Sequence, residues 1–151
     1  MKYSDDVSSI DSIVSANICV LSGEKGEKRD WNRFRYHYYP EAKLIGIFHR
    51  KDTVIHRETT VEEFIEKAGN SYESFGFHER QLGLEVDKFG HIAQVFQSFE
   101  ASYEKDGVMM KKRGINAYQL MFKDNRWWIL SITWEDETES NLIPEDYLTR
   151  N

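Results

Sequence analysis

Residues 113–134, RGINAYQLMFKDNRWWILSITW, decide the fold. The stretch predicts two long strands joined by a tight turn at Asp124 and Asn125. A two-residue turn pairs Lys123 with Arg126, and this pair fixes the register of the rest of the hairpin.

Successive side chains of a strand point to opposite faces, so the register sorts the hairpin into two faces. The first is apolar except for one amide and carries Ile115, Ala117, Gln119, Met121, Trp128, Leu130, Ile132 and Trp134. The second face is more polar at one end and carries Asn116, Tyr118, Leu120, Phe122, Trp127, Ile129, Ser131 and Thr133. Neither strand alternates cleanly between apolar and polar residues. We therefore expect both faces to be covered, the first by the protein's own helices and the second by something else.

Composition limits the classes of protein that need to be considered. With 151 residues, 40% of them hydrophobic and 14% aromatic, the chain predicts a single domain, residues 1–151, that buries a sizeable core. A net charge of −6 disfavours nonspecific nucleic-acid binding, which needs a basic stripe. The only cysteine, Cys19, excludes an intrachain disulfide and is predicted to be a core residue. The polar, acidic start and the lack of a membrane-length apolar run favour a cytoplasmic location, with no membrane partner.

Three helices are expected in the first half of the chain. Apolar residues at helical spacing predict the first over Ser9–Leu21, and a charged, solvated loop that includes Arg29 follows it. Asp30 can cap a second helix over residues 31–39, stopped by Pro40. A capping box opens the third at Thr60, and Gly76 ends it.

The remaining segments predict strands, two short ones over Ala42–His49 and Thr53–Arg57 and two longer ones over Phe77–Asp87 and Ile92–Tyr103. A two-residue turn at Asp106 and Gly107 pairs Phe96 with Ala117 and Glu100 with Arg113. This register adds Gln94, Phe96, Ser98 and Glu100 to the first face. A three-residue loop over 89–91 is preferred, because it sets Arg80 and not Glu79 opposite Glu100. The tail, residues 136–151, contains apolar residues and is expected to pack on the body.

The order of these elements resembles the nuclear transport factor 2-like superfamily, which includes ketosteroid isomerase and the SnoaL-like polyketide cyclases. The resemblance covers nearly the whole chain and is carried by GEKRDWNRF (26–34), YYPEAKLI (38–45), HIAQVFQSFEA (91–101), RGINAYQL (113–120) and RWWILSITWEDE (126–137). It implies an α+β fold, a cone-shaped curved antiparallel sheet wrapped around about three N-terminal helices. It also implies a pocket at the open end and dimerisation through the convex face. The best match is to SnoaL-like proteins of unassigned function.

Glu100 is the best candidate for a catalytic residue, because the register puts it on the inner side of a central strand. A structural carboxylate paired with Arg113 or Arg80 is the alternative reading. Gln119 is either satisfied by a protein partner or contacts a ligand. The candidate ligand-binding residues are Tyr38, Phe96, Ser98, Glu100, Gln119, Trp128 and Trp134. Neither a metal motif nor a cofactor motif occurs, so neither kind of ligand is predicted.

Three functions stay open. The first is a small-molecule-binding protein with an apolar pocket in the cone. The second is an isomerase, cyclase or dehydratase that uses a pocket carboxylate as general base. The third is a dimeric interaction module with a vestigial pocket. The homodimer is expected to form through the second face, extended by neighbouring strands to Val95, Phe99, Ala101, Tyr118, Leu120, Phe122, Trp127 and Ile129.

Overall fold

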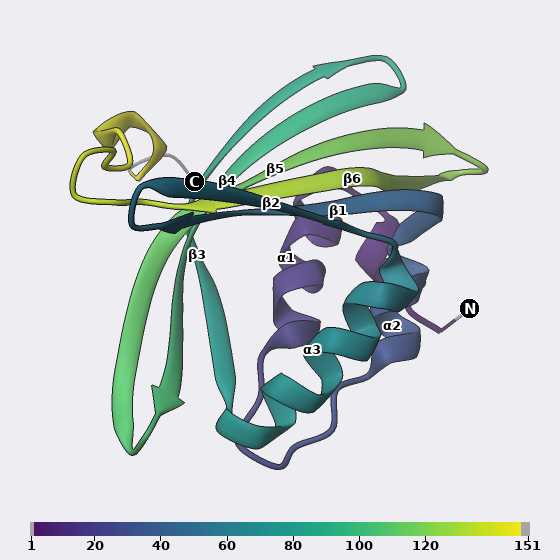
Figure 1. Cartoon of the computed structure of the whole chain (residues 1–151). Coiled ribbons are helices and arrows are strands. Elements are labelled where there is room, and N and C mark those ends of the chain that lie inside the picture. Colours follow the sequence, from purple (N-terminus) through teal and green to yellow (C-terminus); the bar gives the residue numbers. More distant parts are fainter. Residues whose placement is uncertain (1, 149–151) are drawn as a thin grey trace.

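The computed structural model describes residues 2–148 and shows three helices inside a curved six-stranded sheet (Figure 1). The helices are α1 (Ile10–Leu21), α2 (Trp31–Tyr36) and α3 (Val61–Phe75), with short 3₁₀ turns η1 (Ser4–Val7) and η2 (Glu145–Tyr147) near the ends. The strands are β1 (Tyr38–Arg50), β2 (Thr53–Thr59), β3 (Phe77–Phe89), β4 (Ile92–Lys105), β5 (Val108–Lys123) and β6 (Arg126–Asp136).

The sheet has the order β2-β1-β6-β5-β4-β3. Every neighbouring pair is antiparallel except β1 and β6, which run parallel. The sheet bends so that β3 and the adjoining parts of β4 and β5 run down beside the helices (Figure 1). The predicted α+β cone is therefore confirmed, with the difference that its sheet is mixed.

The predicted hairpin turns at 124–125 and 106–107 are confirmed, because Lys123 pairs with Arg126 and Lys105 with Val108. The β3–β4 hairpin differs from its prediction. Its turn has two residues, since Phe89 pairs with Ile92, and a bulge at Leu82 then shifts the register by one. Arg80 still lies opposite Glu100, as expected, but the bulge rather than the loop length puts it there.

A second bulge, at Leu130, reverses the predicted faces of the part of β6 that follows it. Leu120 pairs with Ile129, but Gln119 pairs with Ser131, so Leu130 is the extra residue in β6. Because one inserted residue reverses the faces of all that follow, Ile132 and Trp134 join the face of Tyr118 and Leu120. This face, and not the first, packs on the helices, where its apolar members Val95, Phe99, Tyr118, Leu120, Trp127, Ile129 and Ile132 are buried.

The expected dimer surface is accordingly wrong in its residues. Val95, Phe99, Ala101, Tyr118, Leu120, Trp127 and Ile129 are covered by the protein's own helices, and Phe122 packs partly buried beside them. The sequence could not separate the two faces, because both are largely apolar and no residue pattern marks the bulge.

The caps of α1 and α3 are those that the sequence predicts. Ser9 Oγ accepts from Ser12 N at the start of α1, and Thr60 and Glu63 form the predicted capping box of α3. The second helix ends three residues earlier than predicted, at Tyr36, and Tyr38 already belongs to β1. Cys19 is exposed on α1, which corrects its prediction as a core residue.

The tail packs on the outer face of the sheet. Ser98 Oγ donates to Tyr147 O at 2.6 Å, and Glu137 receives two hydrogen bonds from Arg113. Residues 137–148 thus cover part of the outer face, whereas 149–151 lie outside the described residues. None of the described helices has the length and apolarity needed to cross a membrane.

Candidate functional site

A cavity of about 70 Å³ lies between the helices and the inner face of the sheet. Its apolar wall comes from all three helices and four strands, and includes Ile18, Leu21, Phe34, Leu44, Phe64, Phe77, Phe99, Ile132 and Trp134. Its polar side chains are Asn17, Tyr38, Tyr72, Glu79, Lys112, Asn116 and Tyr118. A small, mostly apolar space with a few convergent polar groups is the usual form of a small-molecule site.

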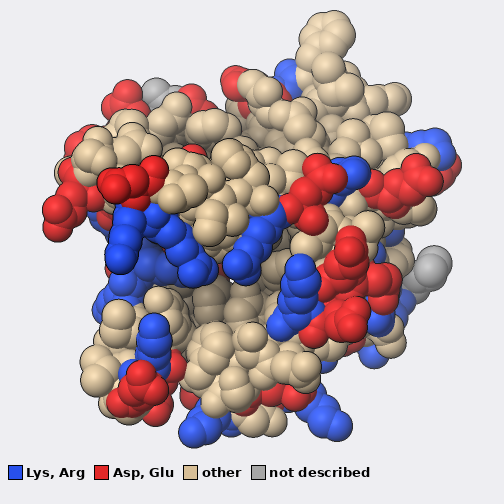
Figure 2. Space-filling view, in the orientation of Figure 1, with Lys and Arg blue, Asp and Glu red and all other residues tan. Residues whose placement is uncertain are grey.

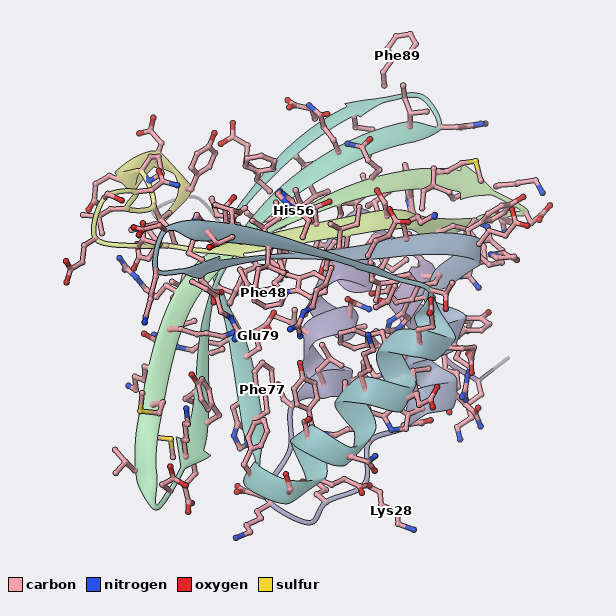
Figure 3. The ribbon with its side chains drawn as sticks, in the orientation of Figure 1. Lys28, Phe48, His56, Phe77, Glu79 and Phe89 are labelled. Carbon is pink, nitrogen blue, oxygen red and sulfur yellow. The ribbon has the colours of Figure 1, made fainter. Side chains whose placement is uncertain are left out.

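The cavity reaches the surface between α3 and the bent part of the sheet. Figure 2 shows a hollow there, with uncharged side chains in its depth and Lys and Arg side chains along much of its rim. Figure 3 places Glu79, Phe77 and Phe48 around the same opening. Lys112, which lines the cavity, forms an ion pair with Asp136 at 3.3 Å. Basic side chains are therefore present at the entrance although the chain as a whole is acidic, and Asp136 pairs with one of them.

Glu79, on β3, is the carboxyl group of the cavity. Its Oε2 accepts a hydrogen bond from Asn116 Nδ2 at 3.0 Å. Burial raises the pKa of Glu79 to about 7, and the Asn116 hydrogen bond and the nearby Lys112 only partly oppose this rise. A carboxyl with this pKa is present in both protonation states near neutral pH. It can therefore donate or accept a hydrogen bond, and can take up or release a proton.

Aromatic rings fix the wall next to Glu79. Tyr72 of α3 stacks on Phe77 of β3, with ring centroids 4.5 Å apart. Phe64 meets Trp134 edge to face at 6.1 Å and stacks on Phe34 at 5.4 Å. Such paired rings hold one another in place, so the cavity has a defined shape before any ligand enters.

A buried polar cluster borders the cavity on the side of α1. Asn17 Oδ1 accepts from the hydroxyl of Tyr38 at 3.1 Å and from that of Tyr118 at 3.4 Å. Burial raises the pKa of both tyrosines, so they stay protonated at neutral pH.

Two of the seven ligand-binding candidates line the cavity, Tyr38 and Trp134. The expected inner position of the other five is wrong, because Phe96, Ser98, Glu100, Gln119 and Trp128 lie on the face opposite to the helices. Glu100 Oε1 accepts from Arg80 Nη2 at 3.0 Å, which matches the structural alternative. Ser98 is covered by the tail, and Gln119 is exposed. The Trp128 ring lies under the Arg126 guanidinium, 3.6 Å from it.

Glu79, Asn116, Asn17 and Tyr118 were not among the predicted site residues. The sequence places Glu79 only as a possible neighbour of Glu100, and it puts Asn116 and Tyr118 on the second face, which is expected to lie away from the helices. The available signal was the polar interruption in otherwise apolar patterns, as at Asn17 in the first helix. Among the described residues, no group of three or more His, Cys, Asp and Glu side chains is arranged to hold a metal ion.

Solved structures resemble the chain over most of its length. A nuclear transport factor 2-like superfamily protein from Salmonella enterica shares 10% identity at a TM-score of 0.65, over 85% of this chain and 89% of that one. This is the nuclear transport factor 2-like fold. The association domain of C. elegans calcium/calmodulin-dependent kinase II shares it at 13% identity and a TM-score of 0.60, over 83% and 91% of the two chains. The beta subunit of benzoate 1,2-dioxygenase from Burkholderia mallei shares 11% identity with the chain at a TM-score of 0.56, over 78% of this chain and 83% of that one.

No family model matches the sequence, and no curated protein matches it either. At identities of 10–13%, the likeness to these structures extends to the fold alone.

Proposed function

We propose that the protein binds a small molecule in the cone cavity and that Glu79 is the group that recognises it. The observation that carries this proposal is a carboxyl with a pKa of about 7, one of whose oxygens is held by Asn116, inside an aromatic wall. A cavity of about 70 Å³ is less than half of a space that holds benzene, about 150 Å³. It therefore accommodates one end of a ligand, whose other, polar end lies at the Lys- and Arg-rich rim (Figure 2).

The proposal is tested by an NMR screen of small ring compounds that carry one hydroxyl, amino or carboxyl group. Compounds that bind the cavity shift the resonances of Asn116, Trp134 and the Glu79 carboxyl. Their affinity changes around pH 7, because Glu79 titrates there. Glu79→Gln removes this pH dependence, whereas the matched change outside the cavity, Glu100→Gln, retains it. Binding with the same affinity and pH profile in Glu79→Gln would refute the proposed role of Glu79.

General acid–base catalysis is the second candidate function. It is favoured by the same pKa, because a group that is half protonated at neutral pH can take a proton from a substrate and return it. Glu79 thus replaces Glu100 as the best candidate for a general base. Ring ketones of the size of the compounds that bind should be incubated with the protein and their proton exchange in deuterated water followed. Exchange at a carbon next to a carbonyl in the parent but not in Glu79→Gln identifies an enzyme.

Association of two copies through the outer face is a further part of the proposal. Phe96 is 43% exposed and Leu142 63% exposed, and both border a groove of about 280 Å³ with Ile47, Ile115 and Ala117. The name of one structural neighbour, an association domain, is consistent with an assembling fold. Light scattering of the parent and of Phe96→Arg tests this, since a buried unpaired Arg would separate the copies.

A further inference from the structure

His37 is a fully buried histidine that does not line the cavity. It follows α2 directly, at the point where the chain turns into β1. One ring nitrogen, Nε2, lies 2.9 Å from Asp6 Oδ2, and the other, Nδ1, lies 3.3 Å from Asn17 Nδ2. The ring therefore connects a carboxylate near the surface with the amide that borders the cavity.

The partners of His37 determine where its hydrogen is. Burial opposes ionisation of Asp6, but hydrogen bonds from Arg33 and His37 more than offset this and lower the pKa of Asp6. An ionised carboxylate only accepts, so His37 Nε2 carries the hydrogen. An amide nitrogen only donates, so Nδ1 is bare and accepts from Asn17. Burial also lowers the pKa of His37, which agrees with a neutral ring.

Because Asn17 Nδ2 points to His37, the carbonyl oxygen of the same amide points toward Tyr38 and Tyr118. This oxygen accepts the hydroxyl hydrogen of Tyr38 at 3.1 Å. The Tyr118 hydroxyl reaches either Asn17 Oδ1 at 3.4 Å or Gln97 Oε1 at 3.3 Å, and both are acceptors. Both hydroxyl hydrogens are thus donated to protein acceptors. The lone pairs of the two hydroxyl oxygens remain to accept a hydrogen bond from a ligand.

The chain of contacts continues to Glu79. Gln97 is anchored by two bonds from its Nε2, to Val14 O at 3.3 Å and to Gln81 Oε1 at 3.0 Å. Its Oε1 accepts from Asn116 Nδ2 at 3.1 Å, and the second hydrogen of the same amide goes to Glu79. Side-chain contacts therefore run from Asp6, near the surface, to the carboxyl in the cavity. Tyr118 has one hydrogen for two acceptors, so it is hydrogen-bonded at a given moment either to Asn17 or to Gln97.

We infer that His37 is a positioning residue for the cavity: held by Asp6, it fixes the amide of Asn17, so that the oxygens of Tyr38 and Tyr118 meet a ligand as hydrogen-bond acceptors. This inference rests on the proposed function and specifies its ligand, whose buried end carries an O–H or N–H group. Reversal of the Asn17 amide would set Nδ2 toward the tyrosines and release the Tyr38 hydrogen toward the cavity.

The first test reads the His37 tautomer in the ligand-free protein by long-range ¹H–¹⁵N NMR at pH 7. We expect a protonated Nε2 and a bare Nδ1. The second follows exchange of the tyrosine hydroxyl hydrogens, through the deuterium isotope shift on Cζ. In His37→Leu the Tyr38 hydroxyl should exchange roughly tenfold faster, the effect of losing about one hydrogen bond. His37→Gln should restore slow exchange, because its amide accepts from Asn17 and donates to Asp6.

The control is His56→Leu, on an exposed β2 residue that lies on the outer side of the sheet (Figure 3). Equal exchange of the Tyr38 hydroxyl in His37→Leu and His37→Gln, or a hydrogen on Nδ1 in the parent, would overturn the inference.

Where His37→Leu does not fold, the variant Asn17→Asp tests the contact between residue 17 and His37 instead. Besides Asp6, the charged groups that act on His37 are Arg33 and Arg126, and the new carboxylate would add to Asp6. It should raise the pKa of His37, and an unchanged pKa would reject the contact.

None of these measurements requires a ligand. Their failure is therefore distinguishable from failure of the proposed function, which the compound screen tests alone.

Discussion

Asn116 Nδ2 donates to Glu79 Oε2 at 3.0 Å across the inner face of the cone, joining β5 to the edge strand β3. The strands are not neighbours, since β4 lies between them. The bond is possible because β3 and the adjoining parts of β4 and β5 bend down beside the helices, so that side chains of β3 and β5 meet on the concave side of the sheet (Figure 1). The same bend half-buries the Glu79 carboxyl, and this burial raises its pKa to about 7.

The first prediction concerns the stability of Glu79→Gln. The folded-state pKa of about 7 exceeds the unfolded value of 4.5, so the unfolded chain releases this proton first as pH rises. Ionisation of Glu79 therefore destabilises the fold progressively between pH 4.5 and 7, and fully above pH 7. We expect Glu79→Gln to be more stable than the parent by about 3 kcal/mol at pH 8.5 and equal to it near pH 4.

Urea unfolding at the two pH values measures this difference. Glu66→Gln, an exposed position on α3, is the control and should change little at either pH. A Glu79→Gln variant less stable than the parent at pH 8.5 would show that the carboxylate is stabilised by the site rather than strained in it.

Local signals in the sequence predicted several elements and two of the hairpin registers. Ser9, the Thr60 capping box and the turns at 124–125 and 106–107 each fix an element or a register through nearby residues. The bulge at Leu130 has no such local cause. It depends on how β6 meets β1 on one side and β5 on the other, which is decided by tertiary packing.

The second prediction follows from that bulge. Deletion of Leu130 would restore regular pairing and turn Ile132 and Trp134 to the outer face, leaving the core without either side chain. We expect the deletion variant to lose cooperative unfolding, as followed by near-ultraviolet circular dichroism. Leu130→Ala keeps the extra residue and should stay folded. A folded deletion variant with native Trp134 resonances would contradict the role given to the bulge.

The site was harder to predict than the fold, because its residues are polar groups inside the core. Asn17, Gln97 and Asn116 are each buried and bonded to one another or to tyrosines. From the sequence alone, polarity on one face of a strand suggests solvent, since the partners that satisfy it come from other elements. Glu100 is favoured by the sequence for another reason: its register puts Glu100 on the face expected to be inner, whereas the structure turns that face outward.

The third prediction compares two glycines. A Cβ on Gly46 would lie 2.7 Å from both the Phe48 ring and the Trp134 ring, which forms part of the cavity wall. Gly46→Ala should cost about 1–3 kcal/mol and shift the Trp134 resonances. Gly69 lies within α3, with its nearest neighbour Trp31 at 3.6 Å, an ordinary contact. Gly69→Ala should instead stabilise by about 0.5–1 kcal/mol. Thermal unfolding of both variants measures these changes. An equal loss of stability in both would refute the argument that a Cβ at Gly46 collides with the Phe48 and Trp134 rings.

The last prediction concerns Arg29, which the sequence placed in a solvated loop but which is 7% exposed. Its guanidinium donates to main-chain oxygens only. They are Leu21 O at 2.8 Å, Gly23 O at 3.1 Å, Glu24 O at 3.4 Å, Glu27 O at 2.6 Å and Tyr72 O at 3.3 Å. Arg29 thereby joins the end of α1, the loop after it and the last turn of α3, next to the cavity residue Tyr72.

Lysine keeps the charge of Arg29 but presents its hydrogens at a single atom, so it cannot reach carbonyls on several sides. Arg29→Lys should therefore leave buried carbonyls unpaired and cost about 2–4 kcal/mol in urea unfolding. Lys28→Arg is the matched control, because Lys28 points into solvent from the same loop (Figure 3). We also expect the amides of residues 22–28 to exchange faster in Arg29→Lys. Unchanged stability with unchanged exchange would mean that the loop folds without this guanidinium, and that Tyr72 keeps its place in the cavity wall without it.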